Sequence, residues 1–207
     1  MENGYKVPLK NGTCEFVEKK SRFISYLAYV ENEAEAKAFI DSICSKHSDA
    51  THNCVAYRLY NPRIERFSDD GEPAGTAGMP MLEVLKKEDI YNVCVVVTRY
   101  FGGILLGGGG LIRAYSKGVS DILSKVSFAT RLASVTLSLK FSYNKFSKVQ
   151  KLLENTVHCN LSTEFAENIN MTVTVTKDQK FKFCDNVRDL LYGEVEITEI
   201  KSGFDSF

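Results

Sequence analysis

Residues 92–118 of this 207-residue chain read NVCVVVTRYFGGILLGGGGLIRAYSKG. The segment Asn92 to Thr98 is a continuous apolar run, which is typical of a central strand covered on both faces. Tyr100 to Ile112 contains six glycines in thirteen residues. Helical spacing of apolar residues then runs from about Leu111 to Val126. The stretch therefore predicts a strand, a glycine-rich turn and a helix.

The residues before this stretch mix strands and helices. Runs rich in aromatic and β-branched residues predict strands at 16–17, 23–30, 53–60 and 63–67. A helix is expected from Asn32, with Glu35 at the capping-box position. Three glycines and one proline in Ser68–Gly78 (SDDGEPAGTAG) predict a long loop. Pro80 suits the first turn of a short helix that ends at Glu88.

The last 76 residues alternate apolar and polar side chains in three segments, at 135–141, 171–176 and 194–198, as half-buried strands do. A weaker strand is expected at 159–165, and helical spacing appears at 146–153 and 184–191. The order β-α-β-β-α-β is typical of a ferredoxin-like domain. We place the domain boundary so that one domain spans 1–131 and the other spans 132–207.

Composition excludes several classes of protein. The 26 basic and 26 acidic side chains give zero net charge, and 44% of the residues are hydrophobic, so strong disorder and a globally basic chain are excluded. No segment approaches the length of a membrane span, and the first twelve residues lack an apolar signal core. Six cysteines without a CxxC pair indicate reduced thiols. We therefore predict a cytoplasmic protein with no membrane contact, metal or cofactor.

Two polar segments are candidates for a cleft. His52, with Asn53 beside it, lies between a helix and a strand and is a candidate general base. The loop that follows the next strands gathers Asp69, Asp70 and Glu72, and Thr76 lies near its end. An EF-hand is excluded because the alternating ligands and the glutamate at position twelve are absent. The alternative interpretation is that both segments only form turns and caps.

The glycine-rich turn is a candidate site for an anion or RNA. A helix N-terminus offers free N–H groups and a favourable dipole, and glycine lets a phosphate come close. Neither a Walker A motif nor GxGxxG spacing is present. The alternative is a tight strand–helix turn without a ligand. The candidate residues for anion or RNA binding are Arg99, Tyr100, Phe101, Gly102, Gly103, Gly108, Gly109, Gly110, Arg113 and Lys117.

Four blocks carry a resemblance to a known family. SRFISYLAYV (21–30), HSDATHNCVAY (47–57), RFSDDGEPAGTAGMPML (66–82) and the opening stretch together resemble the IMPACT/YigZ family across about 15–125. Residues 132–207 look like the smaller appended domain of the bacterial, two-domain members. The resemblance implies an α+β fold. Its N-terminal domain would be a βα sandwich like the second domain of a small-subunit ribosomal protein, and its C-terminal domain would be ferredoxin-like.

The resemblance also implies a role near translation, which the eukaryotic relatives regulate during amino-acid starvation. Their partner-binding module is a separate N-terminal domain, which we expect this chain to lack. We favour a nonenzymatic factor that binds RNA or a ribosomal partner through residues 1–131. One alternative is an enzyme acting on a phosphorylated small molecule, with His52, Asp69, Asp70 and Glu72 as base or metal ligands. Another is a protein-interaction adaptor without chemistry.

The C-terminal sheet is expected to contribute little to RNA binding. RNA-recognition sheets stack bases on exposed aromatic side chains. The positions predicted to face outward carry none: Thr136, Ser138, Lys140, Thr172, Thr174, Thr176, Glu194, Glu196 and Thr198. We expect this domain to contact protein instead. The sequence leaves open whether the acidic loop and the glycine-rich loop share one cleft.

Overall fold

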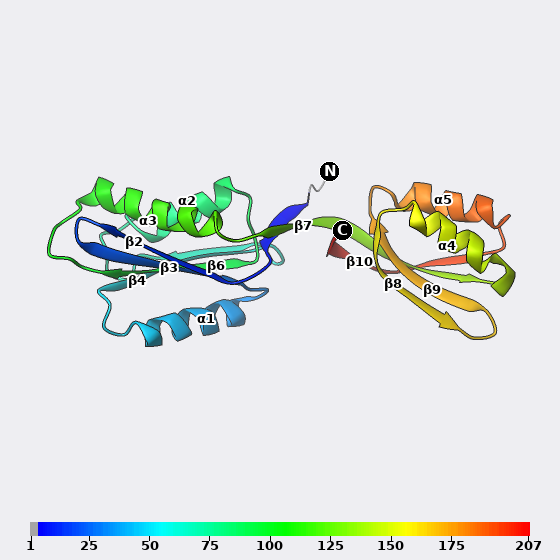
Figure 1. Cartoon of the computed structure of the whole chain (residues 1–207), viewed down its shortest axis with the longest axis horizontal. Helices are drawn as coiled ribbons and strands as arrows, with labels where there is room; N and C mark the ends of the chain where they lie inside the picture. The colour runs from blue at the N-terminus through cyan, green and yellow to red at the C-terminus, as the bar shows by residue number, and fades with distance from the viewer. Residues whose placement is uncertain (1–3) are drawn as a thin grey trace. The chain divides into compact units, whose positions relative to one another are not determined.

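The computed structural model describes residues 4–207, and within that range it contains five α-helices and two antiparallel sheets (Figure 1). The chain divides into two compact units, residues 5–129 and residues 130–207 with Gly4. A mixed α and β architecture is therefore confirmed. Within the described residues, no helix combines the length and the apolar character that crossing a bilayer requires.

The N-terminal unit is built on a five-stranded sheet with the order β2-β3-β6-β4-β5. Helix α1 covers one face, and helices α2 and α3 cover the other (Figure 1). Strand β1 (Tyr5–Pro8) is not part of this sheet but pairs with β7 (Phe128–Phe141) of the second sheet, and its Lys6 forms a bridge with Ile90. The bounds are β2 (Gly12–Glu18), β3 (Ser21–Tyr29), α1 (Glu33–Lys46), β4 (His52–Leu59), β5 (Ile64–Ser68), α2 (Gly78–Lys87), β6 (Val93–Tyr100) and α3 (Gly108–Leu123).

Strand β6 lies at the centre of this sheet and is buried on both faces. Val95 and Val97 pack into the core beneath α2 and α3, whereas Cys94 and Val96 pack into the core beneath α1. All four side chains are fully buried. The prediction of a central strand covered on both faces is confirmed. The sheet itself is antiparallel, so the coverage comes from helices on its two sides.

The cap of α1 is also confirmed. The Asn32 side chain accepts a hydrogen bond from the backbone N–H of Glu35 at 2.9 Å. The Glu35 carboxylate reaches back to the N–H of Glu31 at 2.8 Å. The first bond satisfies an N–H group of the first helical turn that has no acceptor within the helix, and the second fixes Glu31, the residue before the cap.

Helix α3 begins earlier than the apolar spacing indicated, at Gly108 instead of Leu111, and ends at Leu123 instead of Val126. Gly107, with a φ of +74°, precedes its first turn, and the Leu111 N–H donates to the Gly107 carbonyl at 2.9 Å. Glycine costs a helix about 1 kcal/mol relative to alanine. Burial of Leu106 and Leu111 on either side of the turn outweighs that preference.

The C-terminal unit has the predicted order β-α-β-β-α-β. Four strands of its sheet run β10-β7-β9-β8, β1 is a fifth strand paired with β7, and α4 and α5 pack on one face (Figure 1). The bounds are β7 (Phe128–Phe141), α4 (Phe146–Glu154), β8 (His158–Phe165), β9 (Ile169–Thr176), α5 (Lys180–Leu190) and β10 (Glu196–Ser206), with a 3₁₀ turn at Tyr143–Lys145.

The second face of this sheet carries polar side chains, as predicted, with two differences. Thr174 is fully buried, and its hydroxyl lies 2.9 Å from that of Thr136 on the neighbouring strand. Glu194 precedes β10, which begins at Glu196, so it lies in the turn after α5. Cross-strand threonine pairs of this kind stabilise a sheet face without an apolar cover.

Candidate functional site

The acidic loop and the glycine-rich loop meet at one pocket of about 340 Å³, which we call the His52 pocket. This answers the question that the sequence left open. The volume lies at the small end of ligand sites, so it suits a single small group. The lining residues are Thr51, His52, Gly71, Glu72, Pro73, Arg99, Phe101, Leu105, Leu106, Gly107, Gly108 and Leu111.

A buried carboxylate, Glu72, lies at the pocket wall with only 7% of its surface exposed. Its Oε1 accepts hydrogen bonds from Arg99 Nη1 at 2.6 Å and from the Tyr115 hydroxyl at 2.8 Å. Burial raises the pKa of Tyr115, so its hydroxyl stays protonated and can donate. Because Arg99 is itself buried and paired with Glu72, its charge is neutralised inside the protein. Arg99 is therefore part of a buried pair and not a free surface cation.

His52 faces this carboxylate. Its Nδ1 lies 2.7 Å from the Asp70 carbonyl oxygen, so in the neutral ring Nδ1 carries the proton and donates it to that oxygen. Its Nε2 lies 3.8 Å from Glu72 Oε2, beyond hydrogen-bond distance. The His52 ring nitrogen and the Glu72 carboxylate thus face each other at the pocket wall.

The aspartates of the acidic loop accept hydrogen bonds from backbone N–H groups and so fix the conformation of the loop. Asp69 accepts from the N–H groups of Gly75, Ala77 and Gly78 at 2.9, 3.1 and 2.8 Å, which caps the start of α2. Asp70 accepts from the Asn53 N–H at 2.6 Å. Within residues 4–207, no group of three His, Cys, Asp or Glu side chains could hold a metal ion. Asp69 and Asp70 thus both bind backbone N–H groups.

Asn53 and Thr76 also lie in structural positions. The Asn53 side chain accepts from the Thr98 hydroxyl at 2.7 Å and donates to the His47 carbonyl. The buried Thr76 donates its hydroxyl to the Pro73 carbonyl at 2.7 Å. Neither residue is among those that line the His52 pocket.

The Arg99–Phe101 segment divides between the two faces of the sheet. Phe101 lines the His52 pocket, with 45% of its surface exposed and the Arg99 guanidinium 5.5 Å from its ring centroid. Tyr100 points the other way, because neighbouring strand residues alternate in direction, and its hydroxyl contacts His47 and Asp49 at 2.9 and 3.0 Å. Gly102 packs against the Lys20 backbone, and Gly103 has a φ of +83°. Tyr100 therefore does not join Arg99 and Phe101 at one surface.

A second pocket of about 200 Å³ lies on the other side of the first turn of α3, and we call it the Lys19 groove. Leu106 borders both pockets, and the glycine-rich turn contributes Gly107 and Gly108 to the His52 pocket and Gly110 to the Lys19 groove. Lys19 and Arg113 are exposed and have no ion-pair partner in the described chain, whereas Lys117 pairs with Asp121. The groove is lined by Phe16, Glu18, Lys19, Leu106, Gly110, Arg113, Ala114 and Lys117.

Lys19 is not among the residues that the sequence indicated for anion or RNA binding, because those candidates came from the glycine-rich segment alone. The available signal was the pair Lys19-Lys20 between two strands, in a turn where both residues adopt a positive φ. Pairing of β2 with β3 places this turn beside the strand end that leads into the glycine-rich segment.

Cys54 is a structural thiol. It is fully buried, burial raises its pKa to about 12, and its Sγ donates to the Asp69 carbonyl at 3.0 Å. A thiol with so high a pKa supplies almost no thiolate near neutrality, so it is a poor nucleophile.

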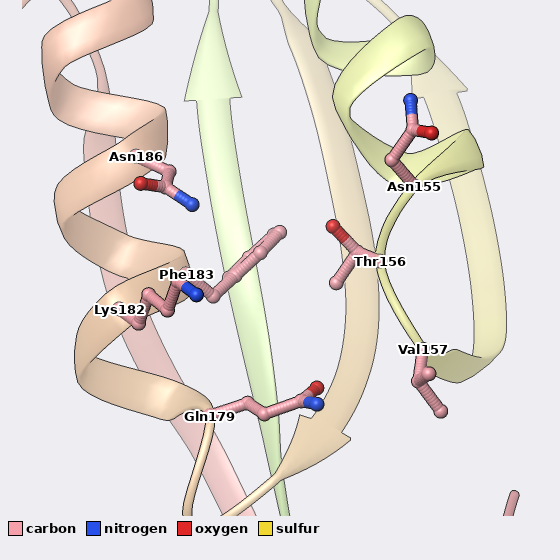
Figure 2. Close-up of a pocket in the computed structure, with 7 residues that line it drawn as sticks. All are labelled: Asn155, Thr156, Val157, Gln179, Lys182, Phe183 and Asn186. Atoms are coloured by element: carbon pink, nitrogen blue, oxygen red, sulfur yellow. The ribbon is translucent and has the colours of Figure 1, made fainter.

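The C-terminal unit has its own pocket of about 190 Å³, between α5 and the turn after α4 (Figure 2). Its lining consists of amide, hydroxyl, apolar and one lysine side chain: Asn155, Thr156, Val157, Gln179, Lys182, Phe183 and Asn186. No carboxylate lines it, and Lys182 is exposed. This pocket therefore lacks the buried charged pair that marks the His52 pocket.

Comparisons with known proteins identify relatives over nearly the whole chain. A family model described as the Impact N-terminal domain matches residues 19–123. IMPACT family member YvyE of Bacillus subtilis is 40% identical over 96% of this chain and 92% of its own length. YigZ of Escherichia coli is 34% identical over 88% of this chain and 91% of its own length. A crystal structure of a hypothetical protein aligns with a TM-score of 0.63 and 32% identity, covering 97% of this chain and 99% of that one.

Proposed function

Because the chain belongs to the IMPACT family, a family linked to translation regulation, we propose that it is a nonenzymatic translation-associated factor that binds RNA through its N-terminal unit. The observation that carries this proposal is the surface around the first turn of α3. Exposed glycine N–H groups lie there between the Lys19 groove and the His52 pocket.

The first turn of α3 supplies donors for phosphate. The N–H groups of Gly108, Gly109 and Gly110 have no acceptor within the helix, and the helix dipole favours an anion beside them. The three glycines present no side chain that would keep a phosphate away. Lys19 and Arg113 add two unpaired positive charges on one side of the turn. Phe101 offers a stacking surface on the other side.

The proposal is tested by the affinity of a fluorescent single-stranded RNA, measured by anisotropy. The variant Lys19→Glu with Arg113→Glu reverses two charges at the α3 turn. The matched control, Lys148→Glu with Lys182→Glu, reverses two exposed lysines of the C-terminal unit. We expect the first variant to bind at least tenfold more weakly and the control to bind like the native protein. Absence of RNA binding by the native protein, or equal losses in both variants, would contradict the proposal.

The finer fold assignments belong to the same proposal. The strand order β10-β7-β9-β8 with both helices on one face supports a ferredoxin-like C-terminal unit. The likeness of the N-terminal unit to the second domain of a small-subunit ribosomal protein rests on the family alone. An experimental structure in which β10 paired with β8 would contradict the ferredoxin-like assignment.

A protein-binding role of the C-terminal unit is a second candidate. The observation that favours it is a set of large apolar side chains that are more than half exposed, Val157, Phe165, Phe181 and Tyr192. Capture of partners from lysate before and after nuclease treatment distinguishes direct protein contact from contact through RNA. Partners that disappear with nuclease would argue against an adaptor role.

A further inference from the structure

The wall of the His52 pocket contains hydrogen-bonding atoms without a partner. Glu72 Oε2 makes no hydrogen bond, and it lies 3.8 Å from His52 Nε2. In the neutral ring that nitrogen is an acceptor as well, because Nδ1 donates to Asp70. Arg99 Nε is buried without a partner in the same cluster. A donor that enters the pocket can therefore reach Glu72 Oε2, which makes no hydrogen bond within the protein.

The opposite side of the pocket has the reverse character. Gly107 and Gly108 bring the start of α3 to the pocket, with N–H donors and a partial positive charge. A phosphate placed at the buried wall would be repelled by the Glu72 carboxylate, so the anionic group of a ligand belongs at the start of α3. The complementary ligand therefore carries a hydrogen-bond donor at one end and an anionic group at the other.

The apolar part of the pocket indicates what lies between these two ends. Phe101 lines the pocket and is nearly half exposed, so part of its ring surface is open, and the Arg99 guanidinium lies 5.5 Å from the ring centroid. Leu105, Leu106 and Leu111 add apolar surface beside it. An aromatic ring with an open face stacks a planar base, and the pocket volume of about 340 Å³ suits one nucleotide and not several.

We propose that the His52 pocket takes one nucleotide of single-stranded RNA whose base carries an exocyclic amino group. The base stacks on Phe101, the amino group donates to Glu72 Oε2 and His52 Nε2, and the phosphate lies at the first turn of α3. Uracil is disfavoured, because it presents a carbonyl oxygen where cytosine presents its amino group. This inference rests on the proposed RNA binding and adds base selectivity to it.

The test compares two RNA hexamers that differ at one base, hexauridylate and the same hexamer with one central cytidine. Their affinities are measured by anisotropy at one fixed salt concentration. We expect the cytidine hexamer to bind about tenfold more tightly, the lower part of the range for a good base contact. His52→Ala should bring the two affinities together. His158→Ala is the matched control, since His158 Nδ1 also lies near a backbone carbonyl, that of Thr156 at 2.8 Å, but in the C-terminal unit.

Two further variants keep the test decisive. Glu72→Gln should also reduce the preference for cytidine, and its melting temperature shows whether it folds. Phe101→Ala, at an exposed position, should weaken both hexamers alike through lost stacking.

The outcomes separate this inference from the proposed function. Salt-dependent binding with equal affinities for the two hexamers would overturn the base-reading pocket and leave RNA binding intact. A cytidine preference that persisted in His52→Ala and in a folded Glu72→Gln variant would also overturn it. Absence of binding to either hexamer would overturn both proposals. Thermal stabilisation by a free apolar amino acid but not by cytidine monophosphate would overturn the assignment of the pocket to a nucleotide.

Discussion

The two units of this protein differ in the charged groups that they bury. The N-terminal sheet is covered on both faces and encloses the charged cluster of Glu72 and Arg99 beside the His52 pocket. The C-terminal sheet is covered on one face by α4 and α5, and its ion pairs each include an exposed partner, as in the pair of Lys145 with Glu194. Burying a charged pair costs desolvation energy that apolar packing of the same volume would avoid. From this difference we expect the functional site to lie in the N-terminal unit.

The largest expected effect is the loss of Glu72. Glu72→Ala leaves the buried Arg99 without its partner and should reduce the free energy of unfolding of the N-terminal unit by about 3–5 kcal/mol. The control in the other unit is Glu194→Ala, whose side chain is 72% exposed, and it should cost less than about 1 kcal/mol. Urea unfolding with hydrogen exchange resolved by peptide assigns each loss to its unit. Equal costs in the two variants would remove the contrast between the units.

The next effect concerns the faces of the two sheets. Val95→Thr and Val96→Thr each place a hydroxyl in a buried face of β6 and should cost about 1–3 kcal/mol. Thr172→Val, on the polar face of β9, should change the stability by less than about 0.5 kcal/mol. An unchanged stability of either threonine variant would show that the helices do not bury that position of β6. The measurement is the urea midpoint of each variant.

A pH effect is expected from His47. Burial lowers the pKa of His47, whose ring lies between the hydroxyls of Tyr26 and Tyr100 at 2.6 and 2.9 Å. The folded state therefore binds this proton less readily than the unfolded chain, whose histidine pKa is about 6.5. Stability of the N-terminal unit should fall as the pH drops below about 6.5, and His47→Gln should reduce this fall. Hydrogen exchange across the pH range checks it, and an unchanged pH profile in the variant would contradict it.

The sequence predicted the secondary structure of both units well, because β6 and the alternating C-terminal strands carry clear periodicities. It misplaced the start of α3, since three glycines at 108–110 have poor helix propensity and only tertiary packing makes them helical. For the site, the sequence offered His52, Glu72 and Arg99 as candidates. It did not predict that the three side chains line one pocket, because β4, β6 and the acidic loop are distant in sequence. The sequence analysis assigned Tyr100 and Arg99 to one binding site. The two side chains point to opposite faces of the sheet, because successive residues of a strand alternate in direction.

The same contrast predicts where RNA binds. If phosphates contact the α3 turn, the C-terminal unit should contribute little, because Lys182 is the one cationic side chain among the residues that line its pocket in Figure 2. The salt dependence of RNA affinity measures those phosphate contacts directly. This effect is smaller in free energy than the loss of Glu72, but it addresses function and not stability.

The most direct test of the central claim is therefore the slope of log affinity against log salt for single-stranded RNA. The native protein should show a clear negative slope. Lys19→Glu with Arg113→Glu should make that slope shallower by about 1.4, since each lost contact to a single strand contributes about 0.7. The control Lys148→Glu with Lys182→Glu should leave it unchanged. A native slope near zero, or an equal change in the control, would contradict an RNA site at the start of α3.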